Sequence, residues 1–145
     1  MKLLIINGPN LNMLGIREPA IYGAENYETL CRRILDFAAA NHVEAELYQS
    51  NHEGDLVDKI QAAYFDGTDG IVINPGAYTH TSVALLDAVK AVGLPTVEVH
   101  ISDVSAREDF RQVSYIRAAC AATISGHGLA GYTEAMQLLL ERAKA

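Results

Sequence analysis

The sequence has no tryptophan, only two cysteines, and fewer basic than acidic side chains. Its 11 Lys and Arg residues stand against 18 Asp and Glu residues, and the formal net charge of −7 argues against nucleic acid or an anionic membrane as a partner. No apolar run approaches the ~20 residues of a transmembrane helix, and the run after Met1-Lys2 is too short for the core of a signal peptide. We therefore expect a cytoplasmic protein with neither a membrane nor a nucleic-acid partner.

Cysteine and histidine are too scattered to predict a metal centre. Cys31 and Cys120 match no spacing of a metal site or a disulfide, and we expect both to be buried as small apolar side chains in a reducing compartment. His52, His80 and His100 lack the i, i+4 spacing of paired zinc ligands. We therefore expect no metal ion.

Apolar, strand-like segments alternate with amphipathic helical segments along the chain. Half of the 145 residues are apolar, which is enough to bury one sizeable core. Such alternation predicts a parallel sheet with helices on both faces, and five strands favour the flavodoxin-like order. We expect a single doubly wound α/β domain over residues 1–145. The expected strands are residues 3–7, 43–49, 70–73, 96–101 and 121–125, the second of them near an edge; the expected helices are residues 25–41, 55–65, 82–92 and 131–144.

Polar residues gather where the expected strands end. The first strand ends in Asn7-Gly-Pro-Asn10, and polar segments at residues 49–53, 74–76 and 98–102 end the next three strands. In a parallel sheet these carboxyl ends share one edge, and ligands of doubly wound proteins bind there. The sequence thus predicts a site at that edge.

The connection between the first strand and the first helix is unusually long. Such connections normally take ~2–6 residues, and a longer one is typically a functional loop. The segment at about 10–24 combines prolines, glycines and asparagines with Arg17 and Tyr22, so we expect an active-site lid. The alternative is a surface excursion whose Asn, Gly and Pro only form turns.

Glu98 and His100 are two apart on a strand, so they point to the same face. A carboxylate beside an imidazole fixes its tautomer and raises its basicity, as a general acid near neutral pH requires. A purely structural pair at the strand end accounts for the spacing equally well.

Three weaker features admit both a functional and a structural role. Arg107 and Arg111 are four apart, which predicts one helical face; they could clamp an anion or belong to a surface row with the neighbouring acidic residues. A helix start near Ser102 would offer free N–H groups to a carboxylate. The glycines of residues 126–131 resemble a phosphate loop only loosely, and we expect them to shape the turn before the last helix.

Four segments carry a far more specific pattern than a single glycine fingerprint. They are Asn7-Gly-Pro-Asn-Leu-Asn with Gly15-Ile-Arg-Glu-Pro and Ile21-Tyr-Gly, then Gln49-Ser-Asn-His-Glu-Gly, then Ile73-Asn-Pro-Gly-Ala-Tyr-Thr-His-Thr-Ser, then Glu98-Val-His-Ile-Ser. In this order they closely resemble type II 3-dehydroquinate dehydratase, and the resemblance runs nearly from end to end. It implies a flavodoxin-like fold, a homo-oligomer that is usually a dodecamer of trimers, and removal of water from the small molecule 3-dehydroquinate to give 3-dehydroshikimate without a cofactor.

The resemblance also implies five catalytic residues. Tyr22, with its pKa lowered by Arg17, would take a proton from the carbon beside the ketone. Asn10 would help position a water that stabilises the resulting enolate. His100, oriented by Glu98, would protonate the departing hydroxyl.

Further residues are implied in substrate binding. The side chains of Asn74, His80 and Arg111 would bind hydroxyl groups of the substrate. The backbone N–H groups of Ile101 and Ser102 would hold its carboxylate.

The resemblance places Asp87 near the site of a neighbouring subunit within the trimer. The sequence departs from the family pattern at Leu86, Asp103 and Ser105, which bears on subunit contacts, loop stability and substrate affinity. The same reaction would serve either the shikimate pathway or the use of quinate.

The amino-acid sequence leaves two alternative functions open. A flavodoxin-like binding module for FMN, or a response receiver, would need a Ser/Thr-rich phosphate loop or grouped acidic residues where Asn7, Pro9 and Asn10 stand. A dehydratase acting through a lysine imine would need a lysine at the rim. The lysines instead fall at a terminus or on helix faces, at Lys2, Lys59, Lys90 and Lys144.

Overall fold

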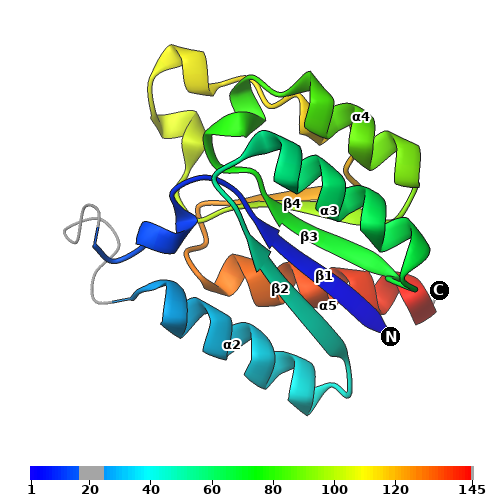
Figure 1. The fold of residues 1–145 in the computed structure, drawn as a ribbon. Helices are drawn as coiled ribbons and strands as arrows, with labels where there is room; N and C mark the ends of the chain where they lie inside the picture. Colours follow the sequence, from blue (N-terminus) through cyan, green and yellow to red (C-terminus); the bar gives the residue numbers. More distant parts are fainter. Residues whose placement is uncertain (17–24, 145) are drawn as a thin grey trace.

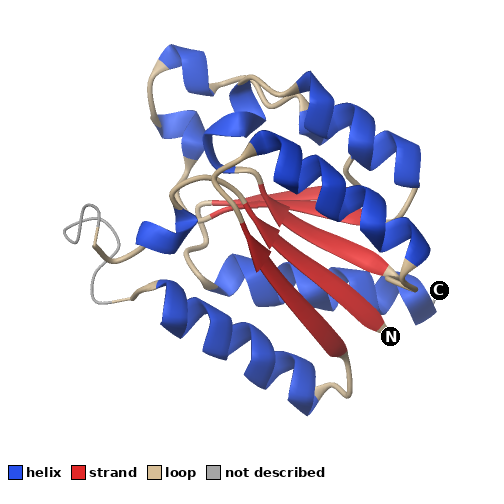
Figure 2. Ribbon diagram, in the orientation of Figure 1, coloured by secondary structure: helices blue, strands red, loops and turns tan. Residues whose placement is uncertain are grey.

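The computed structural model describes residues 1–16 and 25–144, in which helices cover both faces of a twisted parallel sheet (Figures 1 and 2). The strand order is β2-β1-β3-β4-β5, which confirms the flavodoxin-like prediction. Each strand lies within one residue of its expected bounds. The strands are β1 (Lys2–Asn7), β2 (Glu44–Gln49), β3 (Gly70–Asn74), β4 (Thr96–His100) and β5 (Ala122–Ser125).

Two helices pack on each face of the sheet (Figure 1). On one face lie α2 (Tyr27–Ala40) and α5 (Ala130–Lys144), and on the other lie α3 (Glu53–Phe65) and α4 (Val83–Val92). Successive residues of a strand point to opposite faces, so one strand supplies both cores. In β1, Leu3 and Ile5 pack beneath α2 and α5, whereas Leu4 and Ile6 pack beneath α3 and α4.

Side-chain caps fix where two of these helices begin. The Asn26 side chain accepts a hydrogen bond from the backbone N–H of Thr29 at the start of α2. The Ser82 side chain does the same for Leu85 at the start of α4. Asn and Ser are preferred at this position because they satisfy N–H groups that have no partner within the helix. None of the described helices is both long and apolar enough to cross a membrane.

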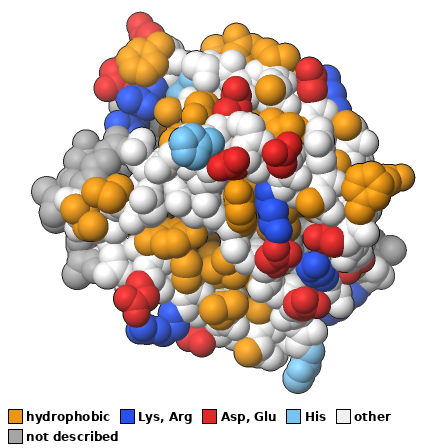
Figure 3. Space-filling view, in the orientation of Figure 1, with side chains coloured by type: hydrophobic (Ala, Val, Ile, Leu, Met, Phe, Trp, Pro, Cys, Tyr) orange, Lys and Arg blue, Asp and Glu red, His pale blue; other side chains and the backbone are white. Residues whose placement is uncertain are grey.

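The exposed face around the edge strand β2 carries acidic and basic side chains close together (Figure 3). Lys2 lies 3.6 Å from Glu46 and 3.5 Å from Asp66, and Lys59 also pairs with Glu46. Charged side chains on an edge strand discourage pairing with other chains. Two of the four lysines are therefore engaged far from the carboxyl edge of the sheet.

Residues 102–119 form loops and three short 3-10 helices, η3 (Val104–Ala106), η4 (Asp109–Arg111) and η5 (Ile116–Ala119). Arg107 lies between η3 and η4 and has extended backbone angles (φ −103°, ψ −169°). Arg107 and Arg111 therefore do not share a helical face, and that prediction is wrong. The helix start expected near Ser102 is that of the 3-10 helix η3, which begins at Val104 with Asp103 as its N-cap. Cys31 and Cys120 are half-buried where full burial was expected.

The described beginning of the long connection has structure of its own. Residues Leu11–Met13 form the 3-10 helix η1, and Leu14 is buried in the core beneath α2 and α5. Gly8, just before it, lies against β3: its N–H donates to the Asn74 carbonyl over 2.8 Å. A Cβ at Gly8 would lie 2.4 Å from the carbonyl oxygen of Pro75.

This close approach predicts that Gly8→Ala destabilises the protein. A Cβ essentially never comes within 3.0 Å of a backbone atom, so one of the two loops would have to move. Overpacking of this kind costs about 2–3 kcal/mol of the free energy of unfolding, which urea denaturation measures. Gly54→Ala in α3 is the matched control, because no atom lies within 4 Å of the added Cβ. That variant should be neutral or slightly stabilising; equal stability of the two variants would contradict the prediction.

Candidate active site

A cavity of about 330 Å³ lies at the carboxyl edge of the sheet. It is enclosed by the ends of β1, β3 and β4 together with η1, η2 (Gly76–His80) and the loop after β4. Among the residues described, it brings together seven of those expected at the site: Asn10, Asn74, His80, His100, Ile101, Ser102 and Arg111. The predicted clustering of strand-end polar residues is therefore present.

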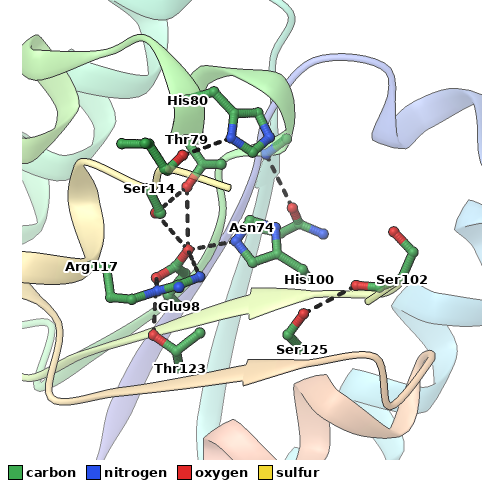
Figure 4. A network of polar contacts seen from close by, with 12 residues as sticks. Asn74, Thr79, His80, Glu98, His100, Ser102, Ser114, Arg117, Thr123 and Ser125 are labelled. Atoms are coloured by element: carbon green, nitrogen blue, oxygen red, sulfur yellow. Dashed lines mark hydrogen bonds and ion pairs between the residues drawn. The ribbon is translucent and has the colours of Figure 1, made fainter. Parts of the chain in front are cut away.

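Glu98 lies two residues before His100 on β4, and both point to the face opposite to Val97 and Val99, which pack with α2 and α5. The two side chains meet (Figure 4). The Nε2 atom of His100 is 2.5 Å from Oε2 of Glu98. Glu98 is fully buried and His100 is 5% exposed. Because a carboxylate accepts a hydrogen bond from Nε2–H, Nδ1 is the ring nitrogen left for a group in the cavity.

Glu98 receives hydrogen bonds from four further side chains (Figure 4). Ser114 and Thr79 donate to Oε2 over 2.8 and 3.2 Å. Thr123 and Nε of Arg117 donate to Oε1, each over 3.0 Å. Burial alone would raise the pKa of Glu98, but the hydrogen bonds from His100, Arg117 and Ser114 bring it down to about 2. Glu98 is thus a carboxylate at any physiological pH.

Asn74 at the end of β3 is held by a buried polar chain. The phenol of Tyr132, on α5, donates to Oδ1 of Asn7 over 2.5 Å and accepts from Nδ2 of Asn74 over 2.9 Å. Oδ1 of Asn74 accepts from the N–H of Gly76 over 3.1 Å. These two contacts distinguish oxygen from nitrogen in the Asn74 amide and fix its orientation at the cavity wall.

Backbone carbonyls after β4 are tied to the glycine-containing loop before α5. Gly126 donates its N–H to the His100 carbonyl over 3.2 Å, and Gly128 donates to the Ile101 carbonyl over 3.1 Å. Both glycines have positive φ, +82° and +61°, so these glycines shape a turn. In a trans peptide the N–H points opposite to the carbonyl, so the N–H groups of Ile101 and Ser102 point away from this loop.

Two arginines and a histidine also line the cavity, beside apolar residues such as Leu11 and Met13. Arg107 and Arg111 both contribute to the lining, although they belong to separate turns. Nε of Arg111 donates to Glu108 over 2.6 Å. Arg111 therefore both pairs with a neighbouring acidic residue and lines the cavity. Nδ1 of His80 lies 2.7 Å from the Val113 carbonyl; since a carbonyl only accepts, Nδ1 carries a proton.

Asp103 and Ser105, in the loop after β4, contact each other. Oδ1 of Asp103 accepts from the backbone N–H of Ser105 over 3.0 Å and from its hydroxyl over 2.6 Å. This local turn opens η3 and leads the chain towards Arg107. The two side chains therefore stabilise this turn of the loop.

Among the described residues, two of those expected at the site, Glu98 and Asp87, do not line the cavity. Asp87 is exposed on α4, away from the cavity of its own chain. Arg17 and Tyr22 lie outside the described residues. None of the four lysines lines the cavity. Within residues 1–16 and 25–144, no three His, Cys, Asp or Glu side chains are grouped so that they could hold a metal ion.

Sequence reasoning missed the side chains that support this site from behind. Thr123 could have been found, because the parallel register of β4 and β5 pairs it with Glu98. Thr79, Ser114 and Arg117 contact Glu98 from segments whose sequence has no helical or strand-like pattern of apolar residues. Tyr132 occupies a position that the sequence of an amphipathic helix assigns simply to the core. No local signal marks these four.

The fold and the cavity together define a flavodoxin-like α/β protein with a buried Glu98–His100 pair at the carboxyl edge of its sheet. The family model of class II dehydroquinases matches residues 1–140. A 3-dehydroquinate dehydratase of Caldicellulosiruptor bescii is 54% identical over 140 residues, which cover 97% of each chain. One of Fusobacterium nucleatum is 54% identical over 143 residues, again with 97% of each chain covered.

A solved structure agrees with these relatives. The type II dehydroquinase from Butyrivibrio crossotus superposes with a TM-score of 0.95 at 56% identity, covering 97% of both chains. The chain belongs to the class II dehydroquinase family, a family of lyases. This membership favours the enzyme over the flavin-binding and receiver alternatives.

Proposed function

We propose that this protein removes water from 3-dehydroquinate to give 3-dehydroshikimate, through an enolate intermediate and without a cofactor. The observation that carries the proposal is the buried Glu98–His100 pair at the wall of a cavity in a chain of this family. The relatives named above as 3-dehydroquinate dehydratases support the choice of substrate.

The proposed general acid is His100. Glu98 fixes its ring by accepting from Nε2, which leaves Nδ1–H of the imidazolium to protonate the departing hydroxyl. The carbon–oxygen bond breaks with its electron pair on oxygen, and the proton from His100 completes the water molecule. The permanent negative charge of Glu98 stabilises the imidazolium before the transfer.

The proposed base is the tyrosinate of Tyr22, assisted by Arg17. A free phenol has a pKa of ~10, so a base at pH 7 needs a shift of ~3 units, or about 4 kcal/mol. One guanidinium 4 Å away supplies only ~1 kcal/mol in bulk water, but about 4 kcal/mol at an effective dielectric constant near 20. The two residues therefore become competent only where water is excluded, as a closing lid would achieve.

Residues of the cavity wall would make the other contacts with the substrate. The N–H groups of Ile101 and Ser102 point away from the glycine-containing loop and would hold the carboxylate. Asn74, His80 and Arg111 would bind the hydroxyls, and Asn10 would position the water at the enolate oxygen. The arginines of the cavity give this region a positive charge, which opposes the net charge of −7 and suits an anionic substrate.

The family resemblance supports a homo-oligomer, a dodecamer of trimers, in the cytoplasm. The exposed position of Asp87 on α4 is compatible with a role at a neighbouring subunit. On the same side of the sheet, α3 ends in Tyr64 and Phe65, which are 60% and 84% exposed. Exposed apolar side chains of this size are typical of subunit contacts.

An ultraviolet assay tests the function directly. Dehydration of 3-dehydroquinate forms a conjugated enone, so absorbance should rise when the purified protein is added. Borohydride added during turnover should leave the mass of the protein unchanged, because no lysine lines the cavity to form an imine. Absence of enone formation would refute the proposed function, and a borohydride adduct would refute the mechanism.

A further inference from the structure

Arg117 is the only arginine among the described residues that contacts Glu98, and it lies outside the cavity. Its Nε donates to Oε1 over 3.0 Å and its Nη2 donates to Oε2 over 3.3 Å, a two-point contact with the carboxylate (Figure 4). The arginine belongs to η5. It is 44% exposed, whereas Glu98 is fully buried.

The contact places a second cation on the carboxylate that orients His100. Oε2 of Glu98 is shared: it accepts from Nε2 of His100 over 2.5 Å and from Nη2 of Arg117. A carboxylate that is already paired with a guanidinium attracts a proton on the imidazole less strongly. The guanidinium of Arg117 also repels the imidazolium of His100, because only the buried carboxylate of Glu98 separates the two cations.

Other ionisable groups around the pair come from three elements. His80 lies on η2, Arg107 and Arg111 reach the cavity from the turns after β4, and Cys120 follows η5. Burial and the charge of Glu98 raise the pKa of the Cys120 thiol to about 12, so it stays neutral. The arginines keep their charge, so Glu98 is the fixed charge in contact with His100, and Arg117 is the fixed charge in contact with Glu98.

We propose that Arg117 is a positioning residue that sets the pH range of the enzyme by limiting how strongly Glu98 holds the proton on His100. With Arg117 present, His100 releases its proton to the leaving hydroxyl more readily. This inference rests on the proposed function for its catalytic meaning, but the interaction itself is tested without substrate.

The sign of the effect follows from charge alone. Removing the guanidinium leaves the Glu98–His100 pair with one positive charge fewer, so the pair binds its proton more tightly. His100 should then lose its proton at higher pH. The alkaline limb of the pH profile of kcat/KM, where His100 loses its proton and can no longer act as the acid, should also shift to higher pH.

The test compares Arg117→Met, Arg117→Gln and Arg117→Lys in the full-length protein. Histidine labelled with ¹³C at Cε1 reports the titration of His100 by NMR, with the signal assigned by its loss in His100→Asn. In the two neutral variants, the midpoint of His100 and the alkaline limb should both rise by about 0.5–1 pH unit. Arg117→Lys, which keeps the charge, should restore most of the original profile.

The same variants separate positioning from substrate binding. KM for 3-dehydroquinate should stay within about twofold, because Arg117 does not line the cavity. Arg142→Met, which removes an exposed arginine from the far end of α5, is the matched control and should leave both midpoints unchanged.

Three outcomes are distinguishable. A folded Arg117→Met or Arg117→Gln variant with an unchanged His100 midpoint overturns the proposal, and two neutral variants guard against the failure of one to fold. A raised midpoint in Arg117→Lys equal to that of the neutral variants also overturns it, because charge would not be the cause. If the wild-type protein forms no enone, the proposed function fails, while the NMR titration still decides the role of Arg117.

Discussion

Tyr22→Phe should lower kcat about 1,000-fold, with a much smaller change in KM. The substitution removes only the oxygen that the proposed mechanism uses to take the proton beside the ketone. A positioned base contributes about 10²- to 10⁴-fold, and none of the tyrosines among the described residues lines the cavity. Steady-state kinetics with the enone assay measures both constants.

Arg17→Ala should reproduce most of this loss, because the phenol would then keep an ordinary pKa and stay protonated. Tyr64→Phe is the matched control: Tyr64 lies near the end of α3, at the edge of the sheet opposite to the cavity. That variant should retain full activity. Near-normal turnover in either Tyr22→Phe or Arg17→Ala would remove the proposed base.

Glu98→Gln should lower kcat by about 100-fold and destabilise the protein by about 3 kcal/mol. The amide cannot accept from all the donors that meet at this position, so Thr79, Ser114 or Thr123 loses a buried partner. The amide also lacks the charge that stabilises the imidazolium of His100. Chemical denaturation and the enone assay measure the two effects separately.

The loss of stability should depend on pH in a defined way. The pKa of Glu98 is about 2 in the folded protein and near 4.5 in the unfolded chain. A depressed folded-state pKa stabilises the protein fully above the unfolded value, and this stability is lost as pH falls from about 4.5 to about 2. The difference corresponds to about 3 kcal/mol. Wild type and Glu98→Gln should therefore converge in stability in strong acid.

Glu134→Gln provides the matched control. Glu134 also pairs with a histidine, His127, over 2.7 Å, but both side chains are about half exposed. Exposed ion pairs contribute little, so stability should change by less than about 1 kcal/mol. If Glu98→Gln resembled this control in stability and activity, the buried carboxylate would not have the role assigned to it.

The fold could be predicted from the sequence because the central strands are buried on both faces and are therefore continuously apolar. Segments such as Leu3–Ile6 and Ile71–Ile73 are apolar without alternation, and only a sheet covered on both faces buries them completely. The carboxyl edge followed from the same argument, because parallel strands place their ends together. Asn10, Asn74 and His100 therefore meet as expected.

Residues 102–119 show where such reasoning fails. The spacing of Arg107 and Arg111 suits a helix, but the side chain of Asp103 captures the N–H of Ser105 and starts a tight turn instead. Competition between side-chain and helical hydrogen bonds is decided by local geometry that periodicity does not report. Arg117 escaped notice for the same reason, since its contact with Glu98 spans 19 residues of irregular chain.

The tether between the carbonyls of residues 100–102 and the loop at residues 125–128 has a mechanical consequence. It joins the proposed carboxylate anchor to β5 and α5, both of which lie within the described residues. In the proposed mechanism this anchor binds the anion, whereas Tyr22 takes the proton. We therefore expect substitutions of Tyr22 or Arg17 to change kcat more than the affinity for the acid group.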